Sequence, residues 1–309
     1  MNPLLKICAM LFAMLFTVDS SYGFLPQRMA TFSRSERLEN QDNLYAKLVL
    51  GGGKIWLSKS SHGELLSVEV EYSKEETKPV FDFRDNEDGE ALLFFSITSK
   101  NHYYDNYDVF EEMDFFDEDH DISLGLSSTK KTSWDLKFTD EIPIEFEIAV
   151  GAAKANLDFT GMKISNLNIE AGASRMFINF DEPNPIIMDE LNIEIGLAKF
   201  KGKNLLNANF DELNIEAGLG SITLDLTGEI NRRVYVNMDL GLGSTTIILP
   251  SNAGVKLYME SSFFTSVDID ELIEVKDDVY ESENWGETEA ELILEIDAAL
   301  GLVKFIFEN

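Results

Sequence analysis

Apolar and polar residues alternate along much of the chain, which is the pattern of β-strands with one buried face. In one clear stretch the apolar residues stand first at odd and then at even positions: Leu213, Ile215, Ala217 and Leu219, followed by Ile222, Leu224 and Leu226. Such a change of parity would turn every later side chain to the opposite face unless the chain bends there. We therefore predict a unit made of a strand, a corner and a second strand, both facing one core.

This unit recurs along the second half of the chain, each time with a glycine at its centre. The central glycines are Gly151, Gly172, Gly196, Gly218 and Gly241, and subtraction gives separations of 21, 24, 22 and 23 residues. Glycine tolerates the backbone angles that a tight corner needs. A period of about 22 residues is typical of stacked coils that bury their apolar faces against one another. The predicted fold class is an all-β solenoid.

Two further copies of the unit extend the repeat toward both ends of the sequence. The first lies around Gly51 to Gly53, and the last lies around Gly301 and ends in the aromatics Phe305 and Phe307, as a terminal cap of the stack would. The predicted organisation is a signal peptide (1–23), an N-terminal linker (24–43), a first coil with an irregular β region and an acidic loop (44–141), and the repeat solenoid (142–309).

The start of the chain resembles a secretory signal. Lys6 precedes an apolar run over residues 7–18, and the small residues Ser21 and Gly23 mark a cleavage site. The run is short for a bilayer span, so we predict export by a signal peptide, with a transmembrane anchor as the alternative. The single cysteine, Cys8, lies inside the run. The exported chain would therefore lack the thiols needed for disulfides or a Cys-based zinc site.

The charge of the chain restricts its partners. The formal net charge is −31, from 56 acidic and 25 basic residues. Nucleic acid needs a basic face to neutralise phosphates, so we exclude it as a partner, and an anionic membrane surface is equally disfavoured. Two interpretations of the acidic balance stay open: solubility in a salty medium, and binding of divalent cations or cationic ligands.

The repeat resembles a known family in several motifs. They are Ile215-Glu-Ala-Gly-Leu-Gly-Ser-Ile222, Trp134-Asp-Leu-Lys-Phe138 before Ile142-Pro-Ile144, Leu249-Pro250 before Gly254-Val-Lys256, and Tyr280-Glu-Ser-Glu-Asn-Trp-Gly286. These motifs resemble the toastrack domain, the extracytoplasmic part of LiaF-like proteins of the response to cell-wall-active antibiotics. They are also similar to the head domains of auto-transporter adhesins. The resemblance covers residues 40–309.

The resemblance implies a right-handed β-helix or a closely related β-solenoid that lies outside the cytoplasmic membrane. It implies no catalytic residues, since the family has none established. Many LiaF-like members carry several transmembrane helices ahead of the domain, whereas this chain begins with a signal-like segment. This departure weakens the inference of membrane-embedded signalling with a histidine kinase.

Outward positions of the repeat form two columns if the coils stack in register. Four residues before the central glycines lie Asn168, Asn192, Asn214 and Asn237, and two residues before them lie Glu170, Glu194, Glu216 and Asp239, with Asp297 equivalent in the last unit. Stacked asparagines can hydrogen-bond as an amide ladder. Stacked carboxylates repel one another, so salt, lysines or a bound cation should offset the repulsion. The column is either a solvated acidic face or a speculative Ca²⁺ site, because calcium prefers several oxygen ligands.

Other candidate chemistry is sparse. The acidic run over residues 114–121 lacks the spacing and glycine of an EF-hand loop and is expected to be an exposed loop. His62, His102 and His120 are scattered, and only the last two could share a metal site in one loop. No nucleophile elbow, P-loop or dinucleotide fingerprint is present. We predict no catalytic residue and no cofactor.

Three functions are compatible with these observations. The first is a non-enzymatic structural or interaction protein outside the cytoplasm, linked to the cell-envelope response, whose partner is an envelope protein or cell-wall component. The second is a cell-surface adhesin or glycan-binding solenoid, which should carry aromatic residues on one outward face. The third is a polysaccharide-active β-helix enzyme, which would need a basic residue beside an acidic groove, and Arg232-Arg233 is the only basic pair in the repeats.

Overall fold

The computed structural model describes residues 28–86, 88–100, 132–262, 264–269 and 271–308. These residues form one sheet of 16 strands, with a single turn of 3-10 helix, η3 (Leu205–Ala208), among the described elements. The strands of the sheet run mostly parallel in its centre and antiparallel at its ends. The prediction of an all-β fold of stacked coils is confirmed.

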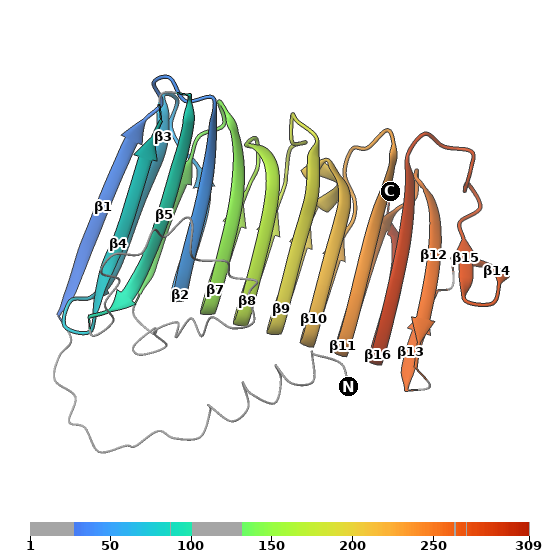
Figure 1. Ribbon diagram of the computed structural model, residues 1–309. Helices are drawn as coiled ribbons and strands as arrows, with labels where there is room; N and C mark the ends of the chain where they lie inside the picture. The colour runs from blue at the N-terminus through green and yellow to red at the C-terminus, as the bar shows by residue number, and fades with distance from the viewer. Residues whose placement is uncertain (1–27, 87, 101–131, 263, 270, 309) are drawn as a thin grey trace, which may run out of the picture.

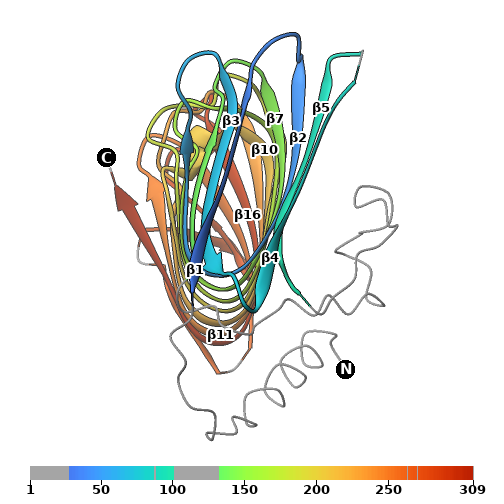
Figure 2. The same cartoon turned by 90° about the vertical axis from the view of Figure 1, so that its left-hand side faces the viewer.

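Seven long strands form the centre of the sheet, and each bends in its middle into a U (Figure 2). They are β2 (Asn43–Lys59), β7 (Pro143–Asp158), β8 (Lys163–Asn179), β9 (Met188–Lys203), β10 (Phe210–Asp225), β11 (Arg233–Pro250) and β16 (Glu291–Glu308). We call the half before the central glycine the first arm and the half after it the second arm. The U-shaped strands nest in register along one axis, in the order given (Figure 1).

The core lies between the two arms of the U. In β10 the side chains of Leu213, Ile215 and Ala217 are buried on the first arm, and those of Ile222 and Leu224 are buried on the second. The inward parity therefore changes at the corner, as predicted. Both arms contribute to a single continuous core that runs the length of the stack.

One detail of the predicted inward face is wrong. Leu219 and Leu300, expected in the core, are 41% and 43% exposed, and Leu197 and Leu242 at equivalent positions are also exposed. The reason is that the corner lies at the position of the central glycine, which is Ala299 in β16, so the leucine after it belongs to the second arm. Its parity is the outward one there, and four leucines form an exposed column at the corner.

The C-terminal strand does not cap the stack. β16 pairs with β11 on one side, and on the other side its first arm pairs with β12 (Gly254–Ser261) and its second arm with β13 (Thr265–Asp268). Two short strands, β14 (Ile273–Lys276) and β15 (Val279–Glu281), then cover the outer edge of β12. The last repeat of the sequence is thus an inner coil, because the strands that precede it pair with its free edge.

At the N-terminal end, too, the order of the strands in the sheet differs from their order in the sequence. β5 (Glu90–Ser99) and β6 (Ser133–Phe138) pair with the first and second arms of β2, so together they form the coil outside it. β3 (Glu64–Ser73) and β1 (Met29–Arg37) extend the sheet antiparallel beyond β6, and β4 (Thr77–Asp85) pairs with β5. The expected linker over residues 24–43 therefore contains a strand. Phe32, Phe81 and Phe95 pack together at this end, with ring centroids 5.7–5.9 Å apart.

Glycines at the corner allow neighbouring backbones to approach closely. A Cβ added to Gly243 would lie 1.9 Å from the carbonyl oxygen of Gly220, and one added to Gly301 would lie equally close to that of Gly243. Gly243 also has a φ of 157°, a conformation that residues with a side chain rarely adopt. The corner column Gly220, Gly243 and Gly301 therefore needs glycine both for space and for conformation.

We expect Gly243→Ala to lower the free energy of unfolding by about 3 kcal/mol, because the methyl group forces two coils apart at a strained φ. The control is Gly51→Ala, since a Cβ at Gly51 meets no atom within 4 Å. It should change stability by less than about 1 kcal/mol. Urea unfolding of the full chain, followed by tryptophan fluorescence, measures both. Equal stability of the two variants would contradict the close corner stacking.

Candidate functional site

The outward face of the first arms carries the predicted asparagine column. Asn168, Asn192, Asn214 and Asn237 occupy equivalent positions on β8, β9, β10 and β11. The side-chain amides of Asn192, Asn214 and Asn237 each donate to the side-chain oxygen of the asparagine on the preceding coil, at distances of 2.8, 3.0 and 2.8 Å. The predicted amide ladder is confirmed. These hydrogen bonds satisfy the amides among themselves and hold adjacent coils in register.

The predicted carboxylate column runs beside the ladder. Glu170, Glu194, Glu216, Asp239 and Asp297 face one another on consecutive coils. Burial, followed by the charge of Glu216, raises the pKa of the Glu194 carboxyl above 4.5. Burial, followed by the charge of Asp297, raises the pKa of the Asp239 carboxyl above 3.8. Partial burial and, after it, a neighbouring like charge both oppose ionisation of Glu194 and Asp239, so their charged forms reduce the stability of the fold at neutral pH.

The two ends of the first-arm face differ in chemistry. At the N-terminal end Lys47, only 4% exposed, lies 3.2 Å from the Glu147 carboxylate, and these two residues precede Asn168 in the same column. At the C-terminal end Glu295 and Tyr258 follow Asn237 in that column. The face is hollowed at this end, between β10 and β12, where Glu216, Asp239 and Asp297 are part of the lining.

The columns are straight and do not converge on a point. Among the residues that the structure describes, no three His, Cys, Asp or Glu side chains form a group that could hold a metal ion. Neighbouring carboxylates of the column lie on different coils, one at each step of about 4.8 Å. Calcium binding by Glu170, Glu194, Glu216 and Asp239 stays a prediction from the sequence.

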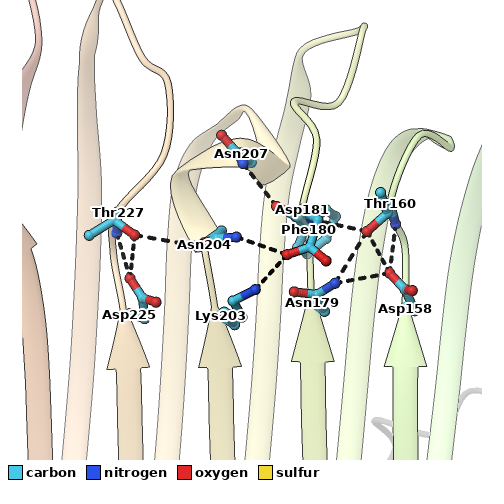
Figure 3. Close-up of polar contacts among 10 residues, drawn as sticks. All are labelled: Asp158, Thr160, Asn179, Phe180, Asp181, Lys203, Asn204, Asn207, Asp225 and Thr227. Atoms are coloured by element: carbon cyan, nitrogen blue, oxygen red, sulfur yellow. Dashed lines mark hydrogen bonds and ion pairs between the residues drawn. The ribbon is translucent and has the colours of Figure 1, made fainter.

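A second polar network joins the ends of the second arms (Figure 3). The Asn179 amide donates to the Asp158 carboxylate at 3.2 Å, and the Lys203 ammonium lies 2.6 Å from the Asp181 carboxylate. Hydrogen bonds from Lys203 and Asn179 lower the pKa of the Asp181 carboxyl. On the next coil the Thr227 hydroxyl donates to Asp225 within its own turn. The network ties each turn to its neighbour and is structural in character.

Arg232 and Arg233, the basic pair that a polysaccharide-active enzyme would use, are engaged in contacts within the stack. The Arg232 guanidinium donates to the Asp211 carboxylate at 2.9 Å and to the backbone oxygens of Asn209 and Phe210. The Arg233 guanidinium donates twice to the Glu291 carboxylate, at 2.8 and 2.6 Å. Both side chains hold adjacent coils together.

Of the remaining candidates from the sequence, only His62 lies within the described residues. His62 is exposed and its Nδ1 lies 3.0 Å from a Glu141 carboxylate oxygen. The acidic run, His102, His120 and the signal segment lie outside the described residues. Within the described ranges, no helix is long and apolar enough to cross a membrane.

One exposed residue on the second arms was missed from the sequence. Trp56 of β2 is 43% exposed on the outward face of its arm. It lines a hollow together with Asn156 and with carboxylates that include Asp135 and Asp158. The alternation that predicts Ile55 and Leu57 to be inward also places Trp56 outward, but the columns predicted from the sequence lie only on the first arms.

One family of known proteins matches most of the chain, and two solved structures show a more distant likeness to it. Residues 27–201 and 184–248 match the family described as the N-terminal domain of toast_rack, DUF2154. A candidate cell adhesion protein from Clostridium sporogenes is 18% identical, with 91% of this chain and 100% of that chain covered and a TM-score of 0.45. A candidate adhesin from Bacteroides fragilis is 9% identical, with 92% and 100% covered and a TM-score of 0.32. None of the curated proteins matches the chain.

The carboxylate column predicts a specific dependence of stability on pH. Because the folded pKa values of Glu194 and Asp239 are raised, the folded state loses stability as pH rises from their ordinary values, 4.5 and 3.8, through the raised ones. Glu194→Gln with Asp239→Asn should therefore stabilise the chain at pH 7 by about 1 kcal/mol in total, a small value because solvent screens the charges.

The gain should vanish below the ordinary pKa values, where the native carboxyls are protonated in both states. Glu287→Gln with Glu289→Gln is the control, because it removes the same charge from an exposed turn before β16. Thermal melting of both variants from pH 3 to pH 8 makes the measurement. A gain that is the same in the control, or that persists at pH 3, would contradict repulsion within the column.

Proposed function

The chain belongs to the family of the N-terminal domain of toast_rack, and from this premise we propose a non-enzymatic interaction protein that works outside the cytoplasmic membrane. The signal-like segment at residues 1–23 supports export. The stacked fold supports a structural role, because the interior of each coil is committed to packing and its outer faces are broad and regular.

One observation carries this proposal: the polar side chains of the first-arm face are arranged as parallel columns. Catalysis needs a nucleophile, a base and an orienting group that converge within hydrogen-bond reach of one reacting atom. Here the amides of Asn192 and Asn214 bond along the stack, and Glu194 and Glu216 lie beside them on the same coils. A repeating surface of this kind is suited to binding an extended or repeating partner.

The proposed partner of this face is an envelope protein or a cell-wall component. The acidic column and the hollow near Asp239 favour a partner that presents cationic groups, because the face is negative and regularly spaced. We further propose a link to the cell-envelope response, which rests on the resemblance of the repeats to the LiaF-like proteins.

Glycan binding at the cell surface is the second candidate function. It is favoured by Trp56, whose exposed indole offers a flat apolar surface next to the amide of Asn156. An aromatic ring of this kind combines an apolar face with a polar N–H and is common at binding surfaces. The third possibility, a polysaccharide-active enzyme, receives no support from the contacts of Arg232 and Arg233.

The first test measures binding of the full chain to cell envelopes isolated from the organism that produces it. We expect sedimentation with the envelopes, and we expect Glu216→Lys with Asp239→Lys to reduce the bound fraction at least fivefold, because it reverses the charge of the face. Glu287→Lys with Glu289→Lys changes the net charge equally elsewhere and should leave binding intact. Absence of binding, or equal loss in both variants, would overturn the proposed role of this face.

The second test concerns location and response. An epitope-tagged full chain should be digested by protease added to intact cells or to cells with a permeabilised outer envelope, whereas a cytoplasmic marker should stay protected. Deletion of the gene should change survival under a cell-wall-active antibiotic, with restoration by the intact gene. Protection of the chain until the cytoplasmic membrane is lysed would contradict the location, and unchanged survival would contradict the response link.

A further inference from the structure

Four cationic side chains form a straight file on the outward face of the second arms. Lys54 of β2, Lys154 of β7, Arg175 of β8 and Lys199 of β9 occupy equivalent positions on four consecutive coils. All four side chains are exposed. The next two coils carry Ser221 and Ser244 at the same position. We call the four residues the cationic file.

The cationic file contrasts with the rest of this acidic chain. The sequence has 56 acidic and only 25 basic residues, yet four of the basic ones stand side by side. No member of the file has an ion pair with a described residue, whereas Lys47, Lys203 and Arg233 all have one. Like charges at a coil spacing of about 4.8 Å repel one another. A ligand with anionic groups at a similar spacing would remove this repulsion.

The column next to the file supplies a different chemistry. Two residues further along each second arm lie Trp56, Asn156, Phe177 and Lys201, again in register on the four coils. Trp56 lines a hollow on this face, with the Asn156 amide on the adjacent coil. An aromatic ring beside an amide, with Lys54 two residues before it on the same strand, can bind the apolar face of a sugar ring together with its hydroxyl and carboxylate groups.

We propose that the cationic file and the column beside it bind an extended anionic polysaccharide, a linear glycan with a carboxylate on each sugar, along the axis of the stack. A pyranose unit in an extended chain advances by a length close to the spacing of the coils. Successive carboxylates would then meet Lys54, Lys154 and Arg175, and one sugar ring would lie on Trp56. The proposal rests on the extracytoplasmic interaction role proposed above and assigns a partner to a second face.

The glycan fits better than other polyanions. Duplex nucleic acid carries one charge about every 1.7 Å along its axis, and the −31 net charge of the chain repels such a dense polymer more strongly than a sparsely charged one. An acidic peptide would use the cations alone and leave the exposed ring of Trp56 uncovered. The hollow at Trp56 is also lined by the carboxylates of Glu69, Glu71, Asp135 and Asp158. A sugar on Trp56 would therefore meet them through its hydroxyls, for which carboxylates are hydrogen-bond acceptors, and would turn its own carboxylate toward Lys54.

The test measures binding of the full chain to polygalacturonate by calorimetry at low and at physiological salt. The file variant is Lys54→Ser, Lys154→Ser and Arg175→Ser, chosen because the chain itself carries serine at this position on β10 and β11. The matched control is Lys74→Ser, Lys78→Ser and Lys276→Ser, which removes the same charge from exposed lysines outside the file. Thermal melting confirms that both variants are folded.

We expect the file variant to lose at least about tenfold in affinity while the control binds as the native chain does. Trp56→Asn should also weaken binding severalfold, and methyl esterification of the polygalacturonate should abolish it. No binding to the polyuronate, or equal binding by the file variant and the control, would overturn the proposal. Polyglutamate or single-stranded RNA that binds as tightly and is indifferent to Trp56→Asn would also overturn it, in favour of a simple charge contact. Retained sedimentation with envelopes would, in these cases, leave the role of the first-arm face standing.

Discussion

The structure depends on the parallel, in-register pairing of U-shaped strands. In such a ladder each residue meets the equivalent residue of the next coil about 4.8 Å away, so every choice of side chain is repeated along the stack. The pairing continues through the corner only because Gly220, Gly243 and Gly301 let one backbone approach the next. The core, the ladders and the charged columns all follow from this register.

Stacking of equivalent residues has opposite effects for different side chains. For asparagine it is favourable, because an amide both donates and accepts, and Asn192 does so with its neighbours on both sides. For Glu194 and Asp239 it is unfavourable, and their raised pKa values record the repulsion and the partial burial. A second set of like charges, the cationic file, adds to this cost on the opposite arm. Columns of like charge oppose the stability of the stack, and a bound ligand of opposite charge would offset that cost.

At both ends of the sheet, antiparallel strands cover the edges that the parallel stack would otherwise leave open. Exposed edges of a parallel stack can pair with other chains and aggregate. At one end β15 and β14 run antiparallel to β12 and shorten its free edge, and at the other β3 and β1 follow β6. The outer strand β4 carries Lys78 and Pro79, residues that discourage further pairing. The stack is thus limited in length without a closed barrel.

The sequence by itself determined the local elements of this protein. The alternation of Leu213 to Leu224 and the recurring glycines were sufficient to predict bent strands, a common core and the two columns of the first arms, since these depend on spacing along the chain. The tertiary structure alone decided that Leu219 is exposed, because that depends on which side of the corner the residue falls. It also decided that β16 lies inside β12 and β13, and that Lys54 stands in file with Arg175 and Lys199. The cause is the same in each case: pairing between strands is a non-local choice among free edges, which periodicity along the chain does not encode.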